Sequence, residues 1–173
     1  MKVTGYQLRE ALRKWTTKME VLKVRFDDSI WEFPGEQKEM PLEVSQEWEK
    51  VMTNVALLQC AQQRYNREVS ITLTNTPREE TMTLAMAVKL LGMYGRLESA
   101  WRKATIGNGK DRWDRGSGAS RSKDTEYAKK SLSQEKLAEC SDNMSNYTSA
   151  LRAAIARGNA TEIDIGEVLP ELL

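Results

Sequence analysis

Apolar side chains recur at steps of three and four residues along four long segments of the chain, and this spacing constrains the fold more than any other feature. Steps of this kind place the apolar positions on one side of an α-helix, which has about 3.6 residues per turn. In the first segment, residues 5–26, the apolar positions are Leu8, Ala11, Leu12, Trp15, Met19, Leu22 and Phe26. Thr4 and Gln7 form a capping box at its start. The pattern therefore predicts a mainly α-helical protein.

A long antiparallel helical hairpin is expected over residues 1–67. Pro34 and Gly35 interrupt the apolar pattern, because both residues favour turns. The second helix is predicted to begin near Pro41, a residue that suits the first turn of a helix. Its apolar positions are Val44, Trp48, Val51, Val55, Leu58, Ala61 and Tyr65. Two helices joined by so short a connection pack side by side in opposite directions.

Two short stretches alternate apolar and polar residues, which indicates strands rather than helices. The stretch "EVSITLT" at 68–74 carries the apolar residues Val69, Ile71 and Leu73 at every second position and is rich in β-branched residues. The stretch "TEIDI" at 161–165 alternates in the same way. We expect residues 69–73 to pair with 161–165 as a small β element.

The remaining two segments predict a third and a fourth helix. The third is expected to open at Thr81 or Thr83 and to run to about Ala104. It is apolar on more than one side, which suggests burial between more than one partner. Ser133 is the expected N-cap of the fourth helix. Gly158 is expected at the C′ position that ends it.

The length of the chain suits a single helical domain of residues 1–173. The expected parts are the helical hairpin (1–67), a strand with the third helix (68–104), a Gly- and Arg-rich loop (105–132), and the fourth helix with a C-terminal strand or tail (133–173). The apolar stripes exceed what one hairpin can bury. We therefore expect an oligomeric helical assembly, a dimer or hexamer, with a self-contained monomeric four-helix bundle as the alternative.

The composition conflicts with a number of function classes. The chain contains no histidine, which excludes Ser-His-Asp and Cys-His catalysis and any His-ligated metal site. No apolar run approaches the roughly 18 residues of a membrane-spanning helix, and the first residues lack the apolar core of a signal peptide. Cys60 and Cys140 lack metal-type spacing and are expected to be buried free thiols. We expect a cytoplasmic protein of bacterial or phage origin, with no cofactor.

Basic residues are concentrated around the Gly-rich stretch "GNGKDRWDRGSGASRSKD" at 107–124. Residues 101–130 hold nine Lys and Arg against four acidic residues, although the whole chain has a net charge of only +1. General nucleic-acid binding is therefore disfavoured, because only one local patch is basic. Glycines allow backbone N–H groups to approach an anion, and arginine binds phosphate in a bidentate manner. The alternative is a solvated flexible loop.

Eight residues are the candidates for binding a small anionic ligand such as a nucleotide. They are Lys110, Arg112, Trp113, Arg115, Arg121 and Lys123 in the loop, with Arg64 and Asn66 where the second helix becomes a strand. The basic groups would neutralise phosphates and Trp113 would stack on a base. A second cluster, Asp27, Asp28, Glu32 and Glu36, could act as acid and base or hold a cation, but such groups more often form a solvated hairpin tip.

The order of motifs resembles that of the septicolysin-like family of bacterial helical proteins. The resemblance rests on "QLREALRKW", the "GE" turn, "QQRYNREVSITL", "TMTLAMAVKLLGMYGRLESAWRKA", the "DRW" loop and "IARGNATEIDI". The matching positions are Gly35, Glu36, Pro41, Arg64, Asn66, Thr83, Leu84, Ala87, Asp111, Arg112, Trp113 and Arg115. Trp113 replaces a family tyrosine, "DRGSG" replaces a Ser-Arg continuation, and "LGMYG" replaces an Arg-Asp pair.

The resemblance implies an all-helical homo-oligomer, built of dimers in a ring or hexamer, without a settled activity. It also implies that the Asp-Arg-aromatic loop holds a ligand or makes an interface. Our first hypothesis is a non-catalytic binding protein, in its sharpest form a phage-type sponge that sequesters a nucleotide signal of host immunity. The second is a structural protein whose basic loop makes subunit contacts. The third is a carboxylate-dependent enzyme or metal protein that uses Asp27, Asp28 and Glu36.

Overall fold

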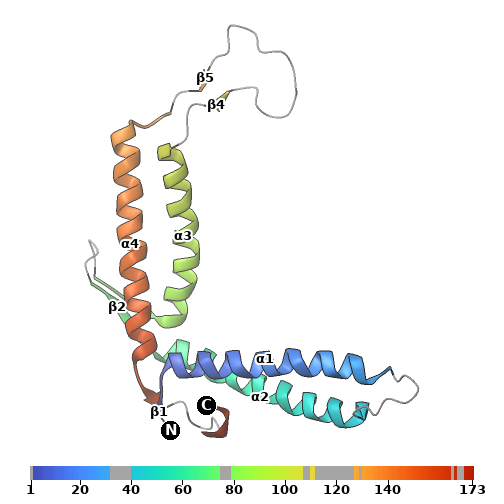
Figure 1. The fold of residues 1–173 in the computed structure, drawn as a ribbon. Helices are drawn as coiled ribbons and strands as arrows, with labels where there is room; N and C mark the ends of the chain where they lie inside the picture. The colour runs from blue at the N-terminus through green and yellow to red at the C-terminus, as the bar shows by residue number, and fades with distance from the viewer. Residues whose placement is uncertain are drawn as a thin grey trace, which may run out of the picture.

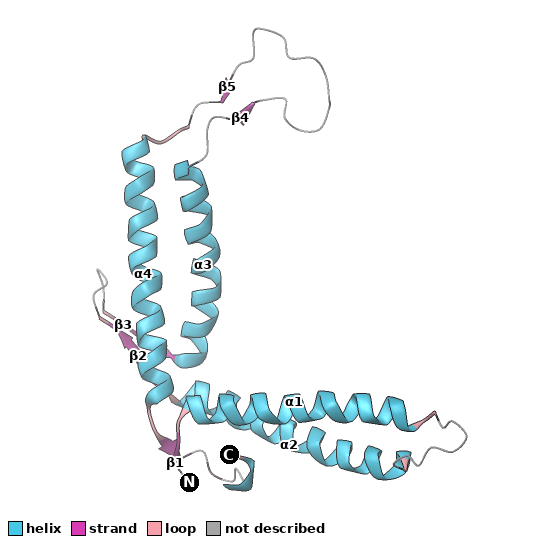
Figure 2. Cartoon of the chain, viewed as in Figure 1, coloured by secondary structure: helices cyan, strands magenta, loops and turns pink. Residues whose placement is uncertain are grey.

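Two helical hairpins form an L-shaped molecule in the computed structural model (Figure 1). The helices are α1 (Gly5–Ser29), α2 (Pro41–Glu68), α3 (Leu84–Ile106) and α4 (Gln134–Ala160). The structure describes residues 2–31, 40–74, 79–106, 110–111, 127–128, 130–164, 166 and 170–173. Helices α1 and α2 form one arm of the L, and α3 and α4 form the other (Figure 2). The predicted mainly α-helical class is confirmed.

The α1–α2 arm is the antiparallel hairpin that the apolar stripes predict. Thr4 caps α1, and its hydroxyl accepts a hydrogen bond from the Gln7 backbone N–H while the Gln7 side chain accepts from the Thr4 N–H. Toward the tip of the arm, buried Leu22, Val44, Val51 and Val55 form a small core of their own. Phe26 and Trp48 pack beside this core with their ring centroids 5.7 Å apart.

The helices of the α3–α4 arm begin where the sequence predicts, but α4 ends later than predicted. Ser133 does cap α4, accepting from the Lys136 backbone N–H. Gly158, however, lies inside α4, which continues to Ala160, so the expected C′ position is wrong. Residues 80–83 form a strand and α3 begins at Leu84, directly after the predicted Thr83, whose hydroxyl accepts a hydrogen bond from the Met86 backbone N–H as an N-cap does.

Short antiparallel ladders join the two arms. β2 (Ser70–Leu73) pairs with β3 (Glu80–Thr83), and β1 (Lys2–Val3) pairs with β6 (Ile163–Asp164). The predicted pairing of 69–73 with 161–165 is therefore wrong, although residues 70–73 and 163–164 each form a strand. The strand that follows β2 in sequence is its partner, and β6 pairs with the N-terminal strand instead.

The main core lies at the corner of the L, where all four helices approach the β2–β3 ribbon. Its buried members are Val3, Leu8, Ala11, Leu58, Ala61, Tyr65, Val69, Ile71, Leu73, Leu84, Ala87, Leu151, Ala154 and Leu172. The C-terminal 3₁₀ turn η1 (Pro170–Leu172) is held against α1, because the Trp15 indole N–H donates to the Leu172 carbonyl at 3.0 Å. This core fixes how the arms meet.

The two cysteines are free, as predicted, but they are not buried as predicted. Cys60 is exposed and Cys140 is half-buried. Cys60 lies on the outer side of α2, between the buried positions Leu58 and Ala61 that face the core. A helix turns by about 100° per residue, so a neighbour of two core positions can face solvent.

Candidate functional site

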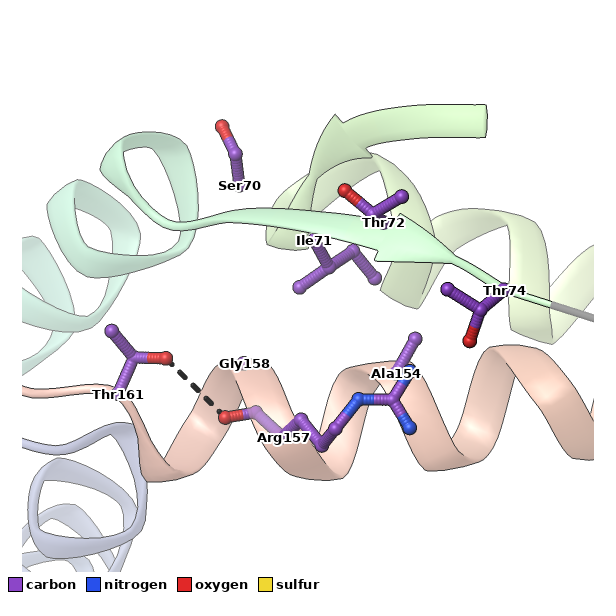
Figure 3. Close-up of a pocket in the computed structure, with 8 residues that line it drawn as sticks. All are labelled: Ser70, Ile71, Thr72, Thr74, Ala154, Arg157, Gly158 and Thr161. Carbon is purple, nitrogen blue, oxygen red and sulfur yellow. Dashed lines mark hydrogen bonds between the residues drawn. The ribbon is translucent and has the colours of Figure 1, made fainter. Parts of the chain in front are cut away.

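A pocket of about 420 Å³ lies between strand β2 and the C-terminal half of α4 (Figure 3). Its lining residues are Ser70, Ile71, Thr72, Thr74, Ala154, Arg157, Gly158 and Thr161. Four of the eight carry hydroxyl groups, one carries a guanidinium, and none carries a carboxylate. The lining therefore offers hydrogen-bond donors and one positive charge.

Gly158 allows β2 to lie directly against α4. A Cβ added at Gly158 would lie 2.6 Å from the Ile71 Cγ2 and 3.3 Å from the Leu84 Cδ1. Residues alternate along a strand, so Ile71 turns inward to the core while its neighbours Ser70 and Thr72 turn away from α4. The close approach of strand and helix forms the apolar floor of the pocket.

Among the described lining residues of the pocket, Arg157 carries the only charge. Its side chain runs along α4 toward Thr74 in Figure 3, and it makes no ion pair with any residue in the described ranges. Its backbone carbonyl accepts a hydrogen bond from the Thr161 hydroxyl at 3.3 Å. An exposed guanidinium without a carboxylate partner presents all of its N–H donors to solvent or to an anion.

The hydroxyl groups of the pocket are not equally available. The Thr72 and Thr81 hydroxyls lie 3.1 Å apart across the β2–β3 ladder, so they hydrogen bond with each other. Ser70 and Thr72 lie on the far side of the strand from Arg157 (Figure 3). Thr74 lies nearest the guanidinium in this view, which makes Arg157 and Thr74 the natural pair for an anion.

Tyr65 packs behind the pocket and contacts two of its lining residues, Gly158 and Thr161. Its side chain is fully buried, and its hydroxyl lies 2.7 Å from both the Gly158 and the Thr161 carbonyl oxygens. Burial raises the pKa of the Tyr65 phenol, so the hydroxyl keeps its proton. Gly5 lies against the same ring, because a Cβ there would be 2.7 Å from the Tyr65 Cε1. The hydrogen bond from the Tyr65 hydroxyl to the Gly158 carbonyl connects the C-terminal end of α2 to the last turn of α4.

Three of the predicted ligand-binding residues, Arg64, Asn66 and Lys110, lie in the described ranges, and the side chains of the first two have local partners. The Arg64 guanidinium donates to the Glu68 carboxylate at 2.6 Å, and this carboxylate raises the pKa of Arg64. The Asn66 side-chain oxygen accepts from the Gln62 amide at 3.0 Å. Neither residue lines the pocket beside Arg157. Glu68 stands four residues after Arg64, a spacing at which an ion pair is expected on a helix.

The other predicted ligand-binding residues lie in or beside the Gly- and Arg-rich segment. Lys110 belongs to strand β4 (Lys110–Asp111), which pairs with β5 (Tyr127–Ala128) beyond the ends of α3 and α4. Arg112, Trp113, Arg115, Arg121 and Lys123 lie outside the described residues. The ladder indicates that the chain doubles back as a β-hairpin at this end of the molecule.

The predicted acidic cluster is not a metal site in the part that the structure describes. Asp27 and Asp28 lie in the last turn of α1, whereas Glu32 and Glu36 lie outside the described residues. Within the described ranges, no three Cys, Asp or Glu side chains come close enough together to hold a metal ion. The carboxylate-dependent hypothesis therefore gains no geometric support there.

Glu98 is a buried carboxylate that the sequence pattern did not single out. Its side chain is 10% exposed, accepts hydrogen bonds from the Thr148 hydroxyl at 2.8 Å and from Arg102 at 3.1 Å, and forms an ion pair with Arg152 at 3.5 Å. The Thr148 hydroxyl, followed by the charges of Arg152 and Arg102, lowers the pKa of Glu98. Every partner holds the ionised form in place, so this group joins α3 to α4 rather than exchanging protons.

Comparisons with known proteins support the fold alone. The sequence matches no protein-family model and no curated protein. A solved structure, the crystal structure of a functionally unknown conserved protein from Corynebacterium diphtheriae, has a similar fold. The match has a TM-score of 0.63 and 18% sequence identity, and it covers 95% of this chain and 100% of that chain. The likeness thus extends over both arms of the L.

None of the helices that the structure describes combines the length and the apolar character needed to cross a bilayer.

Sequence reasoning did not identify Arg157 or Thr74. Arg157 stands in the sequence as an ordinary basic residue in the last turn of a helix, where cations are common because they complement the helix dipole. Only the docking of β2 against α4 brings its guanidinium toward Thr74. The alternation in "SITLT" could have indicated a row of hydroxyl groups along one face of the strand.

Proposed function

We propose that this protein is a non-catalytic, homo-oligomeric binding protein for a small anion of the nucleotide class. The observation that carries the proposal is the Arg157 guanidinium, which lacks an ion-pair partner in the described ranges and lies toward the Thr74 hydroxyl in a pocket whose described lining residues include no carboxylate. Guanidinium and hydroxyl groups are donors suited to phosphate oxygens. The absence of histidine from the chain favours holding a ligand over converting it.

The Gly- and Arg-rich segment contributes to the same proposal through its charge. Residues 101–130 hold nine basic residues against four acidic ones, whereas acidic residues outnumber basic ones in the rest of the chain, and the resemblance to septicolysin-like proteins assigns a ligand or interface role to the Asp-Arg-aromatic stretch. In the strongest form of the proposal, the protein sequesters a nucleotide signal, as a phage-encoded sponge of host immunity would. A cytoplasmic location belongs to this proposal.

Isothermal titration with a panel of cyclic and linear nucleotides tests the proposal. We expect heat of binding with at least one nucleotide, and a large loss of affinity in Arg157→Gln. The matched control is Arg13→Gln, which removes an exposed arginine paired with Glu10 on α1, outside the lining of the Arg157 pocket. No binding of any nucleotide by the correctly assembled protein would refute the nucleotide assignment.

A second pair of substitutions separates ligand binding from a purely structural role of the basic segment. Under the binding proposal, Arg112→Ala combined with Arg115→Ala weakens nucleotide binding and leaves the molecular mass in solution unchanged. If the segment instead makes subunit contacts, the same double variant changes the mass seen by light scattering. The two roles therefore predict opposite outcomes in two measurements.

A further inference from the structure

The apolar residues of α3 form two stripes, and only one of them faces α4. The buried positions Leu84, Ala87 and Glu98 face the interior of the arm. A second stripe, which we call the α3 seam, lies about 100° around the helix. It consists of Met86, Leu90, Met93, Leu97, Ala100 and Ala104. Met86 is 51% exposed, Met93 65% and Leu97 42%, so this stripe is largely uncovered in the single chain.

The spacing of the α3 seam is that of a coiled coil. Its positions follow steps of four and three residues without interruption, the pattern in which successive side chains interlock with those of a second helix. The seam extends for about 27 Å along the helix. It is short for an isolated coiled coil, but α3 is already folded against α4, so pairing would not have to offset the cost of forming the helix.

The residues that flank the α3 seam differ in chemistry from one side to the other. One flank carries Lys89, Arg96 and Lys103 at seven-residue intervals, all exposed and without an ion pair to any residue of the described part of the chain. The other flank carries Tyr94 and Trp101, both half-buried. The Tyr94 ring is held by an edge contact with Tyr147, with centroids 4.8 Å apart.

This asymmetry determines how two α3 seams can meet. In an antiparallel pair the basic flanks would face each other, placing Arg96 against Arg96 of the second copy and Lys89 against Lys103 of the second copy. Like charges directly opposed are unfavourable. In a parallel pair each basic flank faces the aromatic flank of the other copy, which sets Lys89 beside Tyr94 and Arg96 beside Trp101. A cation over an aromatic ring is attracted by it.

We propose that a second copy of this chain docks on the α3 seam, with the two α3 helices parallel, so that the two α3–α4 arms form a four-helix bundle. The proposal names the partner and the surface for the self-association that the proposed function assumes. It is tested by mass and cross-linking, whereas ligand binding is tested by titration, so the two can fail separately.

Analytical ultracentrifugation tests the surface. We expect the wild-type chain, of 19.7 kDa, to sediment at twice this mass or more. Met93→Glu combined with Leu97→Glu should reduce the mass. Val88→Glu is the matched control, because Val88 is 47% exposed on the same helix but lies on another side. Circular dichroism should show equal helix content in all three proteins. A monomeric wild type, or a double variant of unchanged mass, overturns the proposal.

Disulfide cross-linking tests the orientation. The background replaces the native thiols by Cys60→Ser and Cys140→Ser, and a mild oxidant is added. Met93→Cys should cross-link to itself, because parallel helices bring the same seam position of both copies together. A mixture of Met86→Cys and Ala104→Cys chains should remain uncross-linked. A disulfide in this mixture, with none in Met93→Cys, would show that the helices are antiparallel and overturn the proposed orientation.

Discussion

The Tyr65 hydroxyl, at the C-terminal end of α2, lies 2.7 Å from the Gly158 carbonyl oxygen in the last turns of α4. The two residues are 93 positions apart in sequence, and their contact fixes the corner of the L. The same hydroxyl also reaches the Thr161 carbonyl, where α4 ends and the chain turns toward β6. One buried phenol therefore holds together the end of one arm and the end of the other.

Tyr65→Phe should lower the free energy of unfolding by about 1 kcal/mol, because it removes the buried hydroxyl that joins the Gly158 and Thr161 carbonyls, although the Gly158 carbonyl keeps its hydrogen bond from the Thr161 backbone N–H. The measurement is a urea denaturation curve. Tyr6→Phe is the matched control, since the Tyr6 hydroxyl donates to the Ala156 carbonyl at 3.3 Å in an exposed setting. The control should change stability by less than about 0.5 kcal/mol. Equal effects of the two substitutions would contradict the structural role assigned to Tyr65.

Gly158→Ala should destabilise the protein even though it replaces glycine inside a helix. Alanine normally stabilises such a position by about 1 kcal/mol, but the new Cβ would meet Ile71 at 2.6 Å, and overpacking costs about 1–3 kcal/mol. Gly92→Ala in α3 is the control, because a Cβ there meets nothing within 4 Å. Thermal unfolding should move in opposite directions for the two variants. A higher melting temperature for Gly158→Ala would show that β2 does not lie against α4 as described.

Glu98 should make the stability of the α3–α4 arm depend on acid pH. Its pKa is lowered in the folded protein, chiefly by the Thr148 hydroxyl and then by Arg152 and Arg102. The unfolded state therefore binds more protons in the acid range, and stability falls as the pH decreases from the ordinary carboxyl pKa through the lowered one. Glu98→Gln should be less stable than wild type at neutral pH, with the difference shrinking as the pH falls.

Denaturant midpoints measured at a series of pH values give the comparison for Glu98. Glu10→Gln is the control, because Glu10 is an exposed partner of Arg13 on α1. It should leave the pH dependence nearly unchanged. If the denaturant midpoints of Glu98→Gln and wild type change equally with pH across the acid range, the proposed ionised network between α3 and α4 is wrong.

Tyr147 should remain protonated well above the ordinary range of a tyrosine. Burial, followed by the negative charge of Glu80, raises the pKa of Tyr147 to about 12, and the hydroxyl donates to the Glu80 carboxylate at 3.3 Å. The protonated Tyr147 side chain stabilises the folded state, because its pKa is higher there than in the unfolded chain. This stabilisation is complete below the ordinary pKa of about 10 and is lost as the pH rises through about 12. The difference in phenolate absorbance between wild type and Tyr147→Phe isolates this residue. If the absorbance difference between the two proteins appears already near pH 10, the ordinary pKa of a tyrosine, the prediction is contradicted.

The helices could be predicted because their signals are local. The stripe from Leu8 to Phe26, the capping box of Thr4 and Gln7, and the N-cap of Ser133 each depend on residues within a few turns. The strands also appear as alternating residues. The pairing of the strands cannot be predicted in this way, because residues 70–73 could form a ladder with any free strand edge. In the structure they pair with the strand that follows in sequence, residues 80–83.

The candidate site could not be predicted from the sequence, because it too depends on contacts between segments that are far apart in the chain. Arg64 and Asn66 are conspicuous near the end of α2, yet each is bound by a neighbour one helical turn away, Glu68 or Gln62. Arg157 is an ordinary basic residue in the sequence, and only the strand that docks beside α4 brings Thr74 toward it. The binding role of the Gly- and Arg-rich segment stays a prediction.

By itself the sequence determined the helical class, the antiparallel first hairpin and the starts of α1, α2 and α4. These features depend on the spacing of side chains within a single segment, which can be read from the sequence. The tertiary structure decided the partners of the strands, the burial of Gly158 against Ile71, the exposure of Cys60 and the pocket at Arg157. These depend on contacts between residues far apart in the chain. Spacing within a segment carries no information about which distant segment will cover it.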